Sequence, residues 1–185
     1  MQFKKSLMTA TMLTLGGFAA MSANAAGTET STFGVTMQID SVCSVNASGG
    51  AINFGKHDAG TLEASVGTVG VVTSTGTIDV TCSLNSPYIV NLKSTNDLTS
   101  STSGAGQMNH ADGDKVTYQL YSVAKAEAGD EWGSDGTLLA KGTGVSGIGA
   151  GLSTAKTHQV FAKLTSTTDV KLGNYTDTVT ATVTY

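Results

Sequence analysis

Apolar and polar residues alternate over short stretches through most of the chain. A period of two is typical of β-strands, whose successive side chains point to opposite faces of a sheet. The predicted strands are 32–40, 51–55, 77–82, 88–92, 115–121, 137–139, 158–164 and 177–185. Residues 98–106 and most of 124–151 are glycine-rich or polar and predict loops. No stretch beyond residue 25 keeps a period of 3.6 residues, so the pattern predicts an antiparallel all-β sandwich.

Two of these strands have an unusually regular apolar face. In the first, Phe33, Val35, Met37 and Ile39 alternate with Gly34, Thr36, Gln38 and Asp40. In the last, the residues that share a face are Val179, Ala181, Val183 and Tyr185. The first strand follows a polar tether, residues 27–31, and it needs a groove in which to bury its apolar side chains. That groove belongs either to its own domain or to another copy of the chain, and the function depends on which.

Residues 1–25 predict an export signal. Lys4 and Lys5 provide the charged start, residues 7–20 form an apolar run, and residues 23–25 (Ala-Asn-Ala) form a small-residue cleavage site. The apolar run is short for a spanning helix and lacks a basic flank, which disfavours a retained anchor. The predicted organisation is a signal at 1–25, a tether and N-terminal strand at 26–40, and one β domain at 41–185.

Composition narrows the function classes. About 160 residues follow the signal, enough for one domain with a sizeable core. The formal net charge of −4 becomes −6 without Lys4 and Lys5, and the chain has no arginine. Nucleic acids and anionic lipid surfaces are bound through clustered basic residues, so this composition disfavours both as partners.

The chain has two cysteines, Cys43 and Cys82. A single pair in an exported chain is expected to form a disulfide. Metal ligation and a reactive thiol are the alternatives, but there is no CxxC motif and no histidine at ligand spacing. Cys82 shares a face with Ile78 and Val80, which predicts a disulfide beside the core.

Several motifs are candidate sites of chemistry. Residues 142–147 match GxGxxG, but a dinucleotide site requires a following helix, and residues 148–151 (Ile-Gly-Ala-Gly) predict none; we interpret the motif as a flexible loop. Two polar clusters could offer oxygen ligands to calcium, but neither has the EF-hand pattern, and solvated loop acids are the favoured interpretation. These clusters are His110, Asp112 and Asp114, and Asp130, Glu131 and Asp135.

The remaining candidates are histidines and aromatic residues. His57, His110 and His158 lie far apart in sequence, and none is paired with an activated serine or cysteine, so no enzyme activity, metal or cofactor is predicted. Tyr121 and Trp132 could stack on a sugar, but packing in the core or in turns is the favoured interpretation.

An ordered set of motifs resembles the spore coat protein U domain family. The motifs follow the signal and the 32–40 strand, and they lie at 41–45, 52–55, 78–82, 87–88, 116–121, 132–133 and 173–179. The resemblance covers essentially the whole mature chain. One departure is Leu172, which stands where the family usually has a proline before its late Gly-x-Tyr motif.

The resemblance implies a subunit of an archaic chaperone–usher pilus. Such a subunit is an incomplete immunoglobulin-like sandwich that lacks its last strand. A periplasmic chaperone fills the groove first, an outer-membrane usher assembles the fibre, and the N-terminal strand of the next subunit then replaces the chaperone. By this resemblance, Phe33 to Ile39 form the donor strand and Val179 to Tyr185 form the groove edge and chaperone contact.

A different class of function fits the same strands. In this alternative the protein is a secreted monomer whose Phe33 strand completes its own sandwich and whose Trp132 stacks on a surface glycan. The resemblance favours the major rod subunit of a cell-surface pilus that supports adhesion and biofilm formation.

Overall fold

The computed structural model describes residues 27–48, 51–60, 73–98 and 101–185; the predicted signal lies outside them. The chain divides into two units, Met1–Gln38 and Ile39–Tyr185. All strands described here lie in the second unit, and the described residues contain no helix. The strands are β1 (Cys43–Asn46), β2 (Thr73–Cys82), β3 (Pro87–Ser94), β4 (Ala105–Asn109), β5 (Lys115–Tyr121), β6 (Val145–Ile148), β7 (Lys156–Leu164) and β8 (Val179–Thr184).

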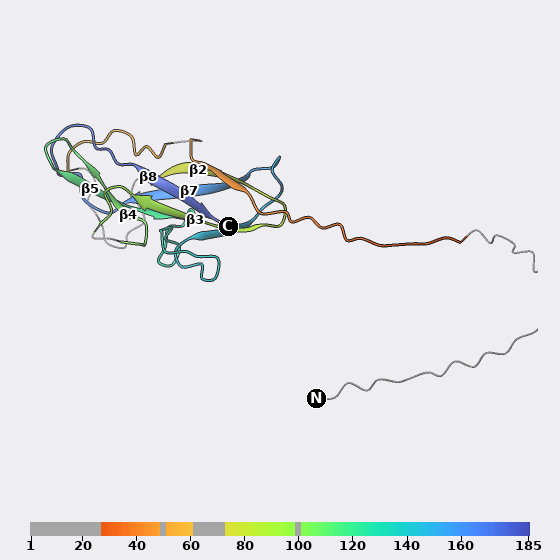
Figure 1. Ribbon diagram of the computed structural model, residues 1–185. Helices are drawn as coiled ribbons and strands as arrows, with labels where there is room; N and C mark the ends of the chain where they lie inside the picture. Colours follow the sequence, from red (N-terminus) through yellow and green to blue (C-terminus); the bar gives the residue numbers. More distant parts are fainter. Residues whose placement is uncertain (1–26, 49–50, 61–72, 99–100) are drawn as a thin grey trace, which may run out of the picture. The chain divides into compact units, whose positions relative to one another are not determined.

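The strands form two antiparallel sheets. One has the order β1-β2-β7-β5-β4 and the other the order β6-β3-β8. Figure 1 shows β8 running beside β3, and yellow β2 beside blue β7. This is an immunoglobulin-like sandwich. In a complete fold the last strand would lie beside β8, at the edge away from β3, and none of the described residues forms a strand there. The predicted all-β sandwich is confirmed.

The core lies between the sheets. It contains the inward residues of β2, β3, β5 and β7, and among them Val80, Val90 and Leu120 are almost completely buried. The alternation predicted the shared inward face of Ile78, Val80 and Cys82 in β2. Trp132 is fully buried as well, and its indole N–H donates a 2.9 Å hydrogen bond to the carbonyl oxygen of Val90. Trp132 is therefore a core residue, and the hypothesis that it stacks on a sugar is wrong.

The disulfide prediction is confirmed. Cys43 and Cys82 are bonded, and they are directly opposed residues of β1 and β2 with Cα atoms 4.1 Å apart. Cys82 is 1% exposed and belongs to the core cluster, as its inward position predicted. The bond links β1, the edge strand of the five-stranded sheet, covalently to its neighbour β2.

The sandwich has two ends, and the site lies along the axis between them. The base is the end where Cys43 meets Cys82 and where Ile89, near the start of β3, meets Thr184, near the end of β8. The top is the opposite end, where Ser94 meets Val179 and where Asn109 pairs with Thr176. β8 therefore runs from the top to the base.

Three predicted strands do not form in this structure, and 32–40 is one of them. Residues 51–55 form no strand, although Ile52 and Phe54 still point inward and are partly buried against the core. Residues 137–139 are also not a strand; they form a tight loop in which the N–H of Thr137 donates to the carbonyl of Ala140 at 2.7 Å, and Leu139 is fully exposed. Neither 51–55 nor 137–139 pairs with a strand among the residues that the structure describes.

Three strands were missed. β1 lies between the predicted strands 32–40 and 51–55, and glycine and polar residues obscured the other two. β4 lies at the end of the predicted 98–106 loop, and β6 lies within the GxGxxG stretch, which is therefore not simply a flexible loop. The glycines of that stretch have a packing role. A side chain at Gly144 or Gly147 would collide with the side chains of Asn91 and Tyr88 from β3, so only glycine lets β6 lie this close.

Candidate functional site: an apolar groove beside an open strand edge

The outer edge of β8 is open. The N–H of Thr95 donates to the carbonyl of Thr178, so these two opposed residues are a hydrogen-bonded pair. Because hydrogen-bonded pairs recur at every second residue of an antiparallel ladder, the backbone groups of Thr180 and Thr182 also bond toward β3. The backbone groups of Val179, Ala181 and Val183 therefore face away from β3. No backbone hydrogen bond reaches these three residues from any part of the chain that the structure describes. Such an edge is a template for another strand.

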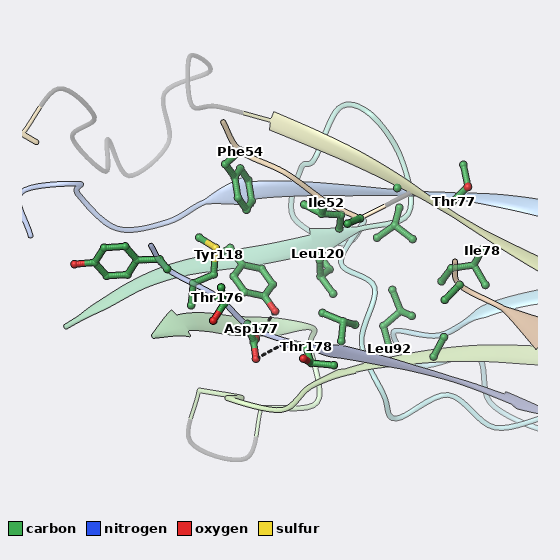
Figure 2. Close-up of a pocket in the computed structure, with 18 residues that line it drawn as sticks. Ile52, Phe54, Thr77, Ile78, Leu92, Tyr118, Leu120, Thr176, Asp177 and Thr178 are labelled. Atoms are coloured by element: carbon green, nitrogen blue, oxygen red, sulfur yellow. Dashed lines mark hydrogen bonds between the residues drawn. The ribbon is translucent and has the colours of Figure 1, made fainter. Parts of the chain in front are cut away.

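A groove of about 390 Å³ lies along this edge. Its lining is mostly apolar and comes from both sheets: Ile78, Leu92, Leu120, Val160, Val179 and Ala181. Figure 2 shows Leu120 and Tyr118 between β8 and the segment that carries Ile52 and Phe54. Core side chains thus form the floor of the groove, where a complete sandwich would be covered by its last strand.

The segment with Ile52 and Phe54 forms the wall opposite β8. Both residues line the groove, and the Phe54 ring lies 6.4 Å from the Tyr118 ring between centroids. Because the segment has no strand partner among the described residues, it contributes side chains to the groove without pairing with β8. The sequence analysis placed these two residues in a strand and did not assign them to a groove.

A partly buried polar network lines the groove near its top. We call it the carboxylate clamp, and it consists of Ser94, Asn96, Tyr118 and Asp177. The hydroxyls of Tyr118 and Ser94 donate to Asp177 Oδ2 at 2.6 and 2.5 Å. The Asn96 side-chain amide and the Thr178 N–H donate to Oδ1 at 2.8 and 2.7 Å. The clamp connects β5 of one sheet to β3 and β8 of the other.

The clamp presents a satisfied carboxylate in apolar surroundings. Burial raises the pKa of Tyr118, and its hydrogen bond to Asp177 raises this pKa further, so the phenol stays protonated and keeps donating. Both carboxylate oxygens of Asp177 already accept two or more hydrogen bonds. Sequence reasoning missed the clamp because its members are distant in sequence and match no motif.

The predicted donor residues lie in the first unit and at the start of the second. Residues 27–42 form no strand, and the exposed fractions of Phe33, Val35, Met37 and Ile39 are 80–87%. Four large apolar side chains at this exposure, at every second position of one segment, form a surface that is normally covered.

The predicted C-terminal residues are arranged differently: Val179, Ala181 and Val183 pack partly against the core, and Tyr185 is 48% exposed just after β8.

The other candidates do not converge on a site. Asp112 forms a 3.0 Å ion pair with Lys171 in an exposed loop, and Tyr121 pairs through its backbone with Glu131. In the ranges described, no group of three or more His, Cys, Asp or Glu side chains is placed to hold a metal ion. None of the described residues belongs to a helix that could cross a membrane.

His158 occupies a half-buried position between the sheets and makes stability depend on pH. Its Nε2 lies 2.8 Å from the Tyr88 hydroxyl, and the Trp132 ring lies 6.1 Å away between centroids. Burial lowers the pKa of His158, and the nearby Asp79 carboxylate only partly opposes this shift. The unfolded chain therefore binds a proton more readily than the folded one, which destabilises the folded state as pH falls below about 6.5.

We therefore expect the free energy of unfolding to decrease between pH 7 and pH 5. Guanidinium unfolding of the purified protein measures it, and His158→Gln is expected to flatten this part of the curve. An identical decline in the His158→Gln protein would contradict the assignment.

Comparisons with known proteins fit this architecture. The profile of the Spore Coat Protein U domain matches residues 29–182. Protein U of Myxococcus xanthus is 29% identical over 173 residues, which are 90% of each chain. The fold and groove define an immunoglobulin-like sandwich with an open edge at β8. The chain belongs to the Spore Coat Protein U domain family.

Two solved structures are also similar. One is the CsuC–CsuE chaperone–tip adhesion subunit pre-assembly complex from archaic chaperone–usher Csu pili of Acinetobacter baumannii, with 21% identity and a TM-score of 0.48. The other is a chaperone–tip adhesin complex of CFA/I fimbriae biogenesis, with 14% identity and a TM-score of 0.38. The matches cover 80% and 77% of this chain but only 40% and 42% of those chains.

Proposed function

We propose that this protein is the major rod subunit of an archaic chaperone–usher pilus and polymerises by donor-strand exchange. The observation that carries the proposal is the open edge of β8 above an apolar groove. The same chain has an exposed segment, Phe33 to Ile39, whose period of two suits that edge. Strand addition to an open sheet edge is an established binding mode.

The proposed partners follow from the open edge. A periplasmic chaperone supplies the missing strand while the subunit is exported, an outer-membrane usher places it in the fibre, and another copy supplies the final strand. The pilus lies on the cell surface and supports adhesion and biofilm formation. The membership in the Spore Coat Protein U domain family supports this assignment.

The energetics suit a permanent joint. Burying the four apolar side chains of the 33–39 segment contributes about 1.5–3 kcal/mol each, or roughly 6–12 kcal/mol before the cost of ordering the strand. Main-chain hydrogen bonds to Val179, Ala181 and Val183 add to this. No nucleotide or metal is needed for a joint of this strength.

Denaturing gels run without and with boiling test the proposal. A polymer joined by donor strands is expected to give a ladder of bands in the unboiled sample and one band after boiling. A single band of monomer size in both samples, from cells that export the protein, would contradict the proposal and favour the self-completed monomer. Electron microscopy of cells with and without the gene checks that the ladder corresponds to surface fibres.

A further inference from the structure

Resting on the proposed function, we propose that Met37 is a site of reversible oxidation and that its sulfoxide stops the subunit from joining a fibre. The reactant is a small two-electron oxidant such as hydrogen peroxide. Met37 is protected once its strand is buried in a neighbouring copy. An oxidant therefore stops the formation of new joints and leaves existing joints intact.

Both methionines beyond the predicted signal belong to the proposed joint. The chain has six methionines. Four lie in the predicted signal, and the other two are Met37 and Met108. Met37 lies in the donor segment, and Met108 lines the groove that is proposed to receive it. Cys43 and Cys82 are bonded to each other and offer no thiol that would compete for the oxidant. The sulfur atoms open to a mild oxidant are therefore concentrated on the two surfaces that must meet.

The two methionines differ in their access to solvent. Met37 is 82% exposed, in a segment that forms no strand in the structure. Met108 lies in β4, is partly buried and packs against the core. Because a dissolved oxidant must touch the sulfur atom, it reaches Met37 first in the unassembled subunit. Met108 provides the internal comparison.

The reaction adds one oxygen atom to the Met37 side chain. A lone pair of the sulfur attacks one oxygen of hydrogen peroxide, the O–O bond breaks, and after proton transfer the products are the sulfoxide and water. The sulfur loses two electrons and the peroxide gains them. The product is polar, and methionine sulfoxide reductases reverse the change.

The groove suits the thioether and does not suit the sulfoxide. Met37 shares its face of the donor segment with the other apolar residues, so it enters the groove with them. The lining of the groove is mostly apolar. Two hydrogen-bond donors in this lining, the Tyr118 hydroxyl and the Thr178 N–H, are already bonded to Asp177. A sulfoxide oxygen that is buried without a donor loses its hydrogen bonds to water, which opposes formation of the joint.

Mass spectrometry tests the protection. The assembled polymer and the unassembled subunit, held in its chaperone complex, are treated with the same concentration of hydrogen peroxide. Sulfoxide formation is then followed at Met37 and Met108. In the unassembled subunit Met37 is expected to oxidise faster than Met108, and in the polymer Met37 is expected to oxidise roughly tenfold more slowly than in the subunit. Equal rates at Met37 in the two samples would overturn the inference.

Assembly of the treated subunit tests the consequence. Treated and untreated chaperone complexes are freed of peroxide and incubated with outer membranes that contain the usher, and their heat-sensitive ladders are compared. Roughly tenfold less ladder is expected after treatment, because the polar sulfoxide must be buried. Methionine sulfoxide reductase is expected to restore most of it. A full ladder from subunits whose Met37 is oxidised would overturn the inference. If the untreated protein forms no ladder, the proposed function itself fails.

Leucine variants assign the effect to one sulfur atom. Met37→Leu removes the thioether and keeps an apolar side chain, so its ladder, whatever its yield, is expected to be the same with and without peroxide. Met108→Leu is the matched variant and is expected to stay as sensitive as the unaltered protein. The reverse pattern would overturn the assignment to Met37. If Met37→Leu gives no ladder, Met108→Leu decides, because Met37 is then the one methionine left beyond the predicted signal. Recovery of its ladder by the reductase supports the inference, and no recovery overturns it.

Discussion

Replacing Met37 with aspartate is expected to abolish polymerisation while the subunit still folds on its chaperone. In the proposed joint, residue 37 lies in the apolar groove, whose lining includes Ile78, Leu92 and Leu120. A carboxylate buried there without a partner costs several kcal/mol, which is comparable with the contribution of two or three of the donor's apolar side chains. The chaperone supplies its own strand during export, so the substitution is expected to leave the chaperone complex intact.

Pilus assembly and the yield of the chaperone–subunit complex are measured for each variant. Gln38→Lys is the matched control, because the neighbouring residue faces away from the groove; it is expected to assemble nearly normally. Loss of the chaperone complex in Met37→Asp would show that the segment belongs to its own domain. Normal assembly of Met37→Asp would show that the inward face of the donor strand is misassigned.

The core strands could be predicted because their environment is simple. β2, β5, β7 and β8 each turn one face toward the core, so burial alone dictates the alternation seen in the sequence. β3 is buried on both faces where Tyr88, Ile89 and Val90 follow one another. The pairing of Cys43 with Cys82 also followed from general reasoning, since an exported chain with two cysteines has one way to pair them within a chain.

The errors share a physical cause. An alternation of apolar and polar residues indicates that one side of a segment is buried. It does not indicate that the backbone of the segment pairs with a neighbouring strand. Ile52 and Phe54 have the burial of a strand but form the wall of a groove. β6 has the opposite problem: Gly144 and Gly147 are required by the side chains of β3 beneath them, and glycine weakens any strand signal.

The groove could be expected from the sequence but its residues could not. Donor-type alternation predicts that a receiving surface exists, whereas the floor of that surface comes from four strands that meet only in the fold. The carboxylate clamp is the clearest case. Ser94, Tyr118 and Asp177 are polar residues at ordinary strand positions, and only the packing of the two sheets brings them together.

Deleting residues 183–185 is expected to abolish accumulation of the subunit in the periplasm. Val183 and Thr184 lie opposite Val90 and Ile89 of β3, whose exposed fractions are 0% and 1%. The deletion removes the cross-strand neighbours of both residues and the Val183 side chain that packs against the core. Uncovering a buried aliphatic side chain such as Val90 costs about 1.5–3 kcal/mol. The deletion also removes the last part of the edge that the chaperone is proposed to pair with, so the loss affects folding and capture together.

Co-expression with the chaperone, followed by extraction of the periplasm, measures this effect. Thr182→Lys is the matched control: Thr182 belongs to the same strand but is exposed, so a charge there stays in water and the complex is expected at its normal yield. Val183→Asp separates the two causes, because it keeps the length of the edge but buries a charge beside Val90. Loss of the complex in both the deletion and Val183→Asp supports the core-packing role, whereas loss in the deletion alone assigns the effect to the backbone edge. A truncated subunit that accumulates normally would contradict the proposal that β8 is the chaperone's attachment strand.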